Sequence, residues 1–250
     1  MNILLTNDDG FDTDLIKGLA STLTYMGHNV TIVAPLTNQS AVAHAVTLHK
    51  AISVYPQSEN VYAVDGTPVD CMFLALNAIL EEMPDLVVSG INYGPNYGDD
   101  IFYSGTVAAA REAFMKGFRA IAISRLNGEN LNDSETVHVA ANVINDLLKY
   151  PMDHYYFNVN IPNVKNLKYS YEFGHVSQKR RWKQAVSYIK TDNKVKSYKI
   201  GGTERKKNQV FGSDSDILSR GVISVTPLDI SVTNLETLTL LMSQERILKG

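Results

Sequence analysis

Short apolar runs alternate along the chain with longer segments in which apolar residues recur every three or four positions. Residues 2–6 form the first run, an amphipathic segment follows at 14–26, and Gly27 separates it from a second run at 29–34. Short apolar runs are typical of buried strands, and the longer repeat is typical of helices that cover a sheet. The alternation continues, with strands expected at 61–64, 85–89, 119–124 and 154–161 and helices at 68–83, 107–116 and 134–148. This order predicts an α/β fold, a Rossmann-like and mostly parallel sheet flanked by helices.

The alternation ends after residue 161, and the patterns beyond it are typical of β-structure. Residues 185–189 and 195–200 flank Thr191-Asp192-Asn193, which predicts a β-hairpin. A last strand is expected at 221–225 and an amphipathic helix at 235–247. We therefore expect a Rossmann-like core at 1–165. Residues 166–250 form a C-terminal β-rich extension with a hairpin arm, the last strand and a terminal helix, which is not an independent domain.

Composition fits an ordinary globular protein of 250 residues, with 44% hydrophobic and 20% charged residues. The first apolar run is too short for a signal sequence, and no run approaches the length needed to span a membrane. We therefore expect a cytoplasmic protein. The only cysteine, Cys71, lies on an apolar helix face and is expected to be a packed core thiol.

The net charge of −3 conceals an uneven distribution. Residues 172–208 carry 11 Lys or Arg against 3 acidic residues, so the rest of the chain carries a charge of −11. A basic segment beside an acidic crevice can attract phosphate-bearing ligands, contact nucleic acid, or form a solvated hairpin that meets an acidic neighbouring subunit. The last of these is the interpretation that we favour.

Two adjacent carboxylates, Asp8 and Asp9, follow the first predicted strand within the sequence Asn7-Asp8-Asp9-Gly10. The carboxyl ends of parallel strands open into the ligand crevice of such folds, so the pair points to a divalent cation or a reacting phosphate. Asp-Gly is also a common turn sequence, and Asn and Asp are common helix caps. The tetrapeptide alone leaves both interpretations open.

Two further segments carry candidate chemistry. The predicted strand at 85–89 ends in the glycine-rich sequence 90–98, a candidate anion cradle. Ser104-Gly105-Thr106 opens the helix predicted at 107–116, where hydroxyl groups and free backbone N–H groups suit a phosphate. Simple helix capping by Ser104 or Thr106 explains the same residues.

Taken together, three segments resemble the SurE family of metal-dependent nucleotidases, the stationary-phase survival proteins. They are residues 5–10 (Leu-Thr-Asn-Asp-Asp-Gly), 88–96 (Val-Ser-Gly-Ile-Asn-Tyr-Gly-Pro-Asn) and 103–107 (Tyr-Ser-Gly-Thr-Val). Supporting matches lie at 33–35 followed by Ser40, at 66–71 and at 224–228, so the resemblance covers nearly the whole chain. It implies a 5′-nucleotidase, a phosphomonoesterase that removes phosphate from nucleoside 5′- and 3′-monophosphates and, in some members, from short polyphosphate.

The resemblance also implies a set of site residues. It makes the oxygen donors of Asp8, Asp9, Ser40 and Asn92 the ligands of one divalent ion per subunit, Mg²⁺ or Mn²⁺, which prefer such donors. The ion would polarise the phosphoryl group or acidify a bound water for in-line attack, with Asp8 and Asp9 as the catalytic pair. Phosphate binding is assigned to Asn96, Ser104, Gly105 and Thr106, and His44 is a further candidate.

Some positions depart from the family pattern. Asp229 stands where the family commonly has His after the Thr-Pro-Leu segment, and Asp214 matches an acidic family position without a known role. Arg180-Arg181-Trp182 resembles a basic-aromatic element that binds the base or phosphate or lies at a subunit contact. Because the family exchanges the hairpin arm and the terminal segment between subunits, the resemblance implies a homodimer or homotetramer.

Two other functions compete with this one. In a haloacid-dehalogenase-like phosphatase, Asp8 would attack phosphorus and a second Asp would follow two positions later, where this chain has Gly10. A nucleotide- or RNA-binding module would use the basic residues at 179–207, but the chain lacks the aromatic signature of common RNA modules. We therefore expect nucleoside monophosphates as ligands, and neither nucleic acid nor a membrane.

Overall fold

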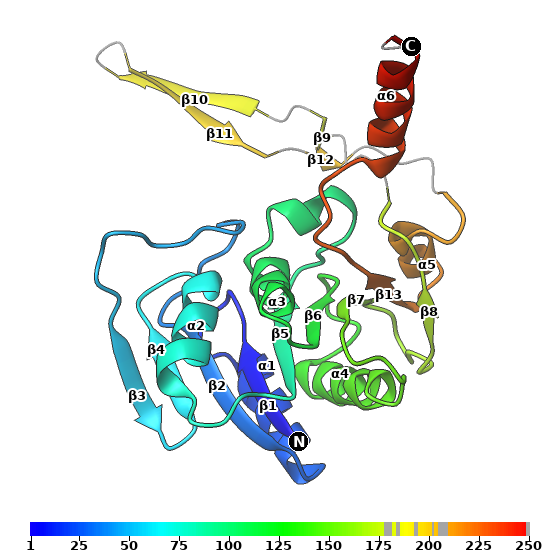
Figure 1. The fold of residues 1–250 in the computed structure, drawn as a ribbon. Helices are drawn as coiled ribbons and strands as arrows, with labels where there is room; N and C mark the ends of the chain where they lie inside the picture. The colour runs from blue at the N-terminus through cyan, green and yellow to red at the C-terminus, as the bar shows by residue number, and fades with distance from the viewer. Residues whose placement is uncertain (178–181, 184–185, 193–194, 202, 205–209, 249–250) are drawn as a thin grey trace.

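The computed structural model describes residues 1–177, 182–183, 186–192, 195–201, 203–204 and 210–248. Within these residues, nine strands form one mixed sheet (Figure 1). The strands are β1 Asn2–Thr6, β2 Asn29–Pro35, β3 Val54–Ser58, β4 Val61–Val64, β5 Leu86–Tyr93, β6 Ala120–Arg125, β7 Tyr156–Ile161, β8 Tyr171–Phe173 and β13 Ile223–Pro227. Their order in the sheet is β3-β4-β2-β1-β5-β6-β7-β13-β8.

The middle of the sheet, from β4 to β7, is parallel throughout. Strands β3 and β13 run antiparallel to their neighbours β4 and β7, and β8 runs parallel to β13. A mostly parallel sheet with antiparallel additions confirms the predicted α/β class. Strands β8 and β13 belong to the segment 166–250 and extend the sheet of the first 165 residues, whereas the domain boundary at residue 165 stays a prediction.

Helices cover both faces of the sheet (Figure 1). They are α1 Asp14–Tyr25 and α4 Asp133–Leu147 on one face, and α2 Pro68–Leu74 and α3 Gly105–Met115 on the other. Alternate residues of each strand point to opposite faces, so Leu5 packs with Ile16 and Ile144 while Leu4 packs with Met72. These two apolar layers hold β1 and β5 rigidly, and the loops that follow both strands begin from a fixed base.

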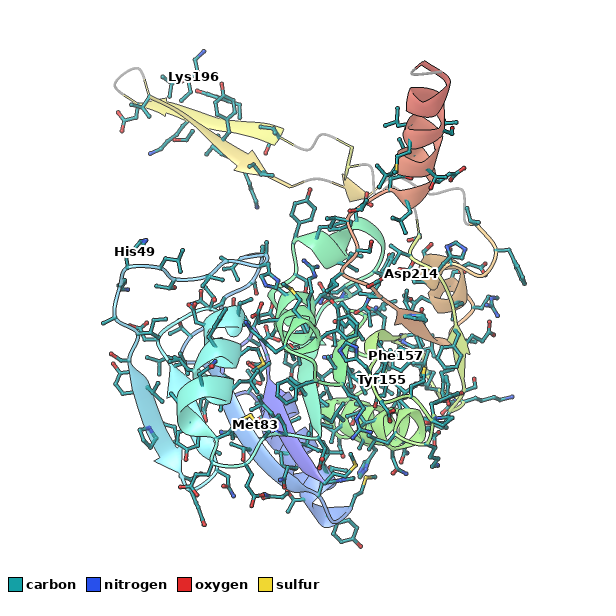
Figure 2. The ribbon with its side chains drawn as sticks, in the orientation of Figure 1. His49, Met83, Tyr155, Phe157, Lys196 and Asp214 are labelled. Atoms are coloured by element: carbon teal, nitrogen blue, oxygen red, sulfur yellow. The ribbon has the colours of Figure 1, made fainter. Side chains whose placement is uncertain are left out.

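The helix predicted at 68–83 ends earlier than expected. After α2 the chain makes a π-helical turn at Ala75–Ile79, and Leu80 already has extended backbone angles. Pro84 disfavours helical angles at Met83, so a helix could not continue through that residue. The apolar periodicity extended to Met83, which lies outside the helix (Figure 2).

The sequence pattern did not reveal four short elements. They are the edge strands β3 and β8, a 3-10 turn at Gly98–Phe102 and helix α5, Asp214–Ser219. Each is short, and β3 and β8 carry mostly exposed side chains, so none has a clear apolar periodicity. Two of them matter for the site because Gly98–Phe102 continues the glycine-rich loop and α5 carries Asp214.

The predicted hairpin forms an arm that projects from the rest of the molecule (Figure 1). Strands β10, Val186–Asp192, and β11, Val195–Ile200, pair antiparallel. Short strands β9, Trp182–Lys183, and β12, Thr203–Glu204, pair at its base, and helix α6, Leu235–Leu248, follows β13. Part of the basic segment lies outside the described residues, including Arg180, Arg181, Ala185, Asn193 and all of 205–209. No helix in the described part of the chain is long and apolar enough to cross a membrane.

A candidate metal and phosphate site

Loops at the carboxyl ends of the parallel strands surround a cleft of about 700 Å³. Five residues predicted from the sequence line it, namely Asp8, Ser40, Asn92, Asn96 and Ser104. They come from the loops after β1 and β2, from the end of β5 and the loop after it, and from the residue that caps α3. The topology therefore brings together residues that are up to 96 positions apart, at the edge of the sheet where ligands bind in open α/β folds.

Asp8 lies almost fully buried at the bottom of this cleft, with 4% of its surface exposed. The Thr106 hydroxyl donates a 2.5 Å hydrogen bond to Asp8 Oδ1. Burial raises the pKa of Asp8 to about 6, the Thr106 hydrogen bond opposes this rise, and the neighbouring Asp9 charge adds to it. Among the residues that the structure describes, no Lys, Arg or His pairs with Asp8, and a bound cation would provide the positive charge.

Asp9 is held by two donors in different loops. Asn38 Nδ2 and the backbone N–H of Tyr93 each donate a 3.1 Å hydrogen bond to its carboxylate. The Asn38 side chain also accepts a 3.0 Å hydrogen bond from the Ser40 N–H, so Asn38 connects Ser40 to Asp9. Burial raises the pKa of Asp9 as well, against these hydrogen bonds.

The donor chemistry of this cluster fits a hard divalent cation. Asn92 Nδ2 donates a 2.7 Å hydrogen bond to the Gly94 carbonyl, which leaves Asn92 Oδ1 as an acceptor. Two carboxylates, one amide oxygen and one hydroxyl are oxygen ligands of the kind that Mg²⁺ and Mn²⁺ take. Within the described residues, no group of three or more His, Cys, Asp or Glu side chains could hold a metal ion.

The amino end of α3 lies directly against Asp8. A Cβ atom added at Gly105 would lie 3.0 Å from Asp8 Cβ and 3.1 Å from Asp8 Oδ2, so glycine permits this close approach. Ser104 caps the helix by accepting a 3.1 Å hydrogen bond from the Val107 N–H. The first N–H groups of a helix have no partner within it. The Thr106 N–H interacts with the Asp8 carboxylate, as the Thr106 hydroxyl does, and the Gly105 N–H stands at the helix end where an anion beside Asp8 would bind.

The glycine-rich loop is fixed by a buried polar network around Asn96. The Asn160 side chain accepts a 2.9 Å hydrogen bond from the Asn96 N–H and donates one of 2.9 Å to its carbonyl. Asn158 donates a second hydrogen bond to that carbonyl at 2.7 Å, and the Asn96 side chain donates one of 2.8 Å to Ser124. Both backbone polar groups of Asn96 thus have hydrogen-bond partners, as they would in a strand.

Asp214 is fully buried and joins the glycine-rich loop to the segment that leads to the arm. Its Oδ2 accepts a 2.8 Å hydrogen bond from the Gly98 N–H. Its Oδ1 accepts hydrogen bonds from the N–H groups of Ser177, at 3.0 Å, and Ser215, at 2.6 Å. Figure 2 shows this residue at the start of α5. The acidic position that the sequence left unexplained is thus a connection between three segments.

His44 does not line the cleft. Its Nε2 lies 3.0 Å from Glu112 Oε2, a buried carboxylate seven residues after Gly105 in α3. At 1.5 Å per residue this is about 10 Å along the helix from the candidate phosphate site. The pairing fastens the loop that carries Ser40 to α3.

Several residues that shape the site were not predicted from the sequence, chiefly Asn38, Asn158, Asn160 and Tyr93. One signal was available. Asn158 and Asn160 are two positions apart in a strand, and two polar residues on one face of an otherwise buried strand suggest a polar network. Asn38 and Tyr93 carried no such signal because their partners lie in other loops.

Comparisons with known proteins agree with this geometry. Residues 3–184 match the family described as Survival protein SurE. A protein from Geobacter sulfurreducens named 5′-nucleotidase SurE is 42% identical over 97% of this chain and 93% of its own length. Another of that name, from Geotalea daltonii, is 38% identical over 98% of this chain and 99% of its own. The crystal structure of the SurE protein from Aquifex aeolicus superposes with a TM-score of 0.85 at 34% identity, covering 98% of this chain and all of that one.

Proposed function

The chain belongs to the SurE family and is a 5′-nucleotidase, and from this premise we propose how its cleft removes phosphate from nucleoside monophosphates. The resemblance that the sequence indicated is thereby confirmed. The proposed substrates are nucleoside 5′- and 3′-monophosphates, with short polyphosphate as a further substrate. One observation supports the proposal most strongly, namely that the amino end of α3 lies against Asp8 with only a glycine between them.

Family membership implies a dependence on a divalent metal ion. We assign one Mg²⁺ or Mn²⁺ per subunit to Asp8, Asp9, Ser40 and Asn92, whose oxygen donors suit it. The ion supplies positive charge that polarises the phosphoryl group and acidifies a nearby water. Asn38 and Thr106 orient the two carboxylates by donating to Asp9 and to Asp8 Oδ1.

The chain's own groups would bind the phosphate at the amino end of α3, next to Asp8. The Gly105 N–H lies at the positive end of the α3 dipole, where it stabilises negative charge on the phosphate oxygens. Thr106 contributes by holding Asp8 beside the phosphate through its hydroxyl and its N–H. Ser104 and Asn96 line the same cleft and present polar side chains to it. Because Thr106 donates to Asp8 Oδ1, the other oxygen, Oδ2, is the one beside Gly105 and the incoming phosphate.

Phosphate release from AMP tests this assignment. The wild-type chain should release phosphate with added Mg²⁺ or Mn²⁺ and lose the activity with a chelator. Asp8→Asn should lower kcat/KM by about a hundredfold or more, because it removes a charged ligand from the bottom of the cleft. Asp12→Asn is the matched control, since Asp12 is an exposed carboxylate four residues further on that does not line the cleft. Chelator-resistant turnover, or an active Asp8→Asn variant, would reject the metal site.

We also propose that the arm formed by β10 and β11 joins subunits in a homodimer or homotetramer. Its apolar side chains are exposed, including Val186, Tyr188, Val195 and Tyr198, each with more than half of its surface accessible. A two-stranded hairpin is at best marginally stable alone in water, and an apolar one is expected to pack against another surface.

A further inference from the structure

One end of the cleft has no part in the proposed metal and phosphate chemistry. Tyr93, Gly94 and Asn127 line it, next to Asn92. A nucleoside monophosphate bound by its phosphate at α3 must place its sugar and base elsewhere in the cleft. The side chains at this end therefore decide which part of the nucleotide the protein can recognise.

Tyr93 provides an aromatic surface whose position is fixed. Its hydroxyl donates a 2.5 Å hydrogen bond to Asp133 Oδ2. The Arg125 guanidinium lies over the ring, 4.8 Å from the centroid, and is itself 3.4 Å from Asp133. Although Asp133 and Arg125 both hold it, Tyr93 keeps 41% of its surface exposed. Arg125 covers one face of the Tyr93 ring, so a ligand in the cleft would stack on the other face.

Asn127 adds an exposed polar side chain to this end of the cleft. Among the described residues, no hydrogen bond is made by its exposed side-chain amide. A Cβ atom at Gly94 would lie 3.6 Å from Asn127 Oδ1 and 3.9 Å from Asn92 Nδ2, so this glycine keeps the space between the two amides open. A free amide beside a fixed aromatic ring is the combination that recognises nucleobases, by edge hydrogen bonds and by stacking.

We propose that Tyr93 and Asn127 form a nucleobase subsite, in which the base stacks on the Tyr93 ring and its edge bonds to the Asn127 amide. This inference rests on the proposed nucleotidase function and adds a preference within it. Any base can stack on an aromatic ring, but stacking strengthens with the area of the base. Purine nucleotides are therefore preferred over pyrimidine nucleotides and over sugar phosphates that lack a base.

Substrates with and without a base provide the test. Wild-type kcat/KM should be about tenfold or more higher for AMP than for ribose 5-phosphate, the same phosphoester without the base. Tyr93→Leu should reduce that ratio to near one, mainly by lowering the value for AMP, because the variant keeps the backbone N–H that binds Asp9. Tyr93→Phe retains the ring and should keep most of the preference. Tyr25→Leu, at an exposed tyrosine outside the cleft, is the matched control.

Adenosine binding separates the subsite from the catalytic proposal. Adenosine carries the base without the phosphate, and calorimetry should show that Tyr93→Leu and Asn127→Ala each weaken its binding by about fivefold or more. If Tyr93→Leu lowers kcat/KM equally for AMP and for ribose 5-phosphate, the subsite is overturned, and Tyr93 only supports Asp9. If neither phosphoester is hydrolysed, the nucleotidase proposal fails. Adenosine binding that is equal in all variants would then reject the subsite as well.

Discussion

The most consequential single side chain is Asp8, because it is a carboxylate buried where a charge is unfavourable without a cation. Its pKa is raised from 3.8 to about 6, with burial as the main cause. In the metal-free protein, a raised folded-state pKa contributes stability that is complete below pH 4 and is lost as the pH rises through about 6. Ionised Asp8 therefore destabilises the metal-free fold at neutral pH, on the order of 3 kcal/mol for a shift of this size.

Asp8→Asn should consequently stabilise the metal-free protein at pH 8 while abolishing turnover. The amide can still accept the Thr106 hydrogen bond, and it removes the buried charge. Thermal unfolding in a chelator, measured at pH 4 and pH 8, should show a higher Tm for the variant at pH 8 and a much smaller difference at pH 4. Adding Mg²⁺ should raise the Tm of the wild type alone. A variant less stable than the wild type at pH 8 would contradict the account of Asp8.

Individual ligands were easier to predict than the residues that support them. Asp8, Asp9, Asn92 and Ser104 follow directly from strand ends and helix starts, which the apolar pattern locates. Asn38 and Asn160 act through hydrogen bonds to residues at 9 and 96, and such pairings depend on how loops meet in space. The ligand roles themselves stay predictions, because donor chemistry and proximity support them without a bound ion.

Helix α5 is a short element with an influence on the glycine-rich loop. It places Asp214 so that three backbone N–H groups share one buried carboxylate. Two of those groups belong to Gly98, two residues after Asn96, and to Ser177, which precedes the arm. Loss of the hydrogen bonds to Asp214 should therefore affect phosphate binding in the cleft as well as the stability of the fold.

Asp214→Asn tests that expectation. The amide has one accepting oxygen, so at least one N–H loses its partner and faces the NH₂ group. An unsatisfied buried donor costs about 1–3 kcal/mol, and we expect a lower Tm together with a KM for AMP raised about tenfold. Asp216→Asn is the control, because Asp216 lies in the same helix and accepts from the Gly212 N–H without contacting the loop. Equal KM values in the two variants would show that Asp214 only stabilises the fold.

Long elements with strong periodicity were predicted within a few residues, and short edge elements were not. Strand β1 and helix α4 match their predicted spans closely because each has one clearly apolar face. Strand β5 continues beyond the expected 85–89 to Tyr93, through Gly90, where a Cβ atom would lie 2.2 Å from the Ile123 carbonyl oxygen. A glycine usually suggests the end of a strand, and here it allows β5 to pass close to β6 instead.

The molecule as a whole consists of a tightly packed sheet and an arm with few contacts to it. Within the arm, Tyr188 and Tyr198 pack edge to face with centroids 5.9 Å apart, but both stay more than half exposed. Such a surface is expected to be covered by another copy of the chain.

Replacing both tyrosines, as Tyr188→Ser with Tyr198→Ser, should shift the protein toward smaller assemblies. Light scattering over a concentration series would measure this, with Tyr25→Ser as a control at an exposed tyrosine on α1. The sheet should remain folded, because neither tyrosine contributes to the two apolar layers. An unchanged mass would exclude these tyrosines as subunit contacts.

The hydrogen bonds that hold the backbone of Asn96 affect how the site opens on heating. Loops around active sites often open locally, long before the rest of a protein unfolds, and their amide hydrogens then exchange with solvent. Here the Asn96 N–H is buried and bound to Asn160, and its carbonyl is bound to both Asn158 and Asn160, in the interior strand β7. The loop can open at Asn96 only with the loss of these three hydrogen bonds. We therefore expect the Asn96 amide hydrogen to exchange nearly as slowly as those of β7, so that this part of the site is among the last to open as the temperature rises.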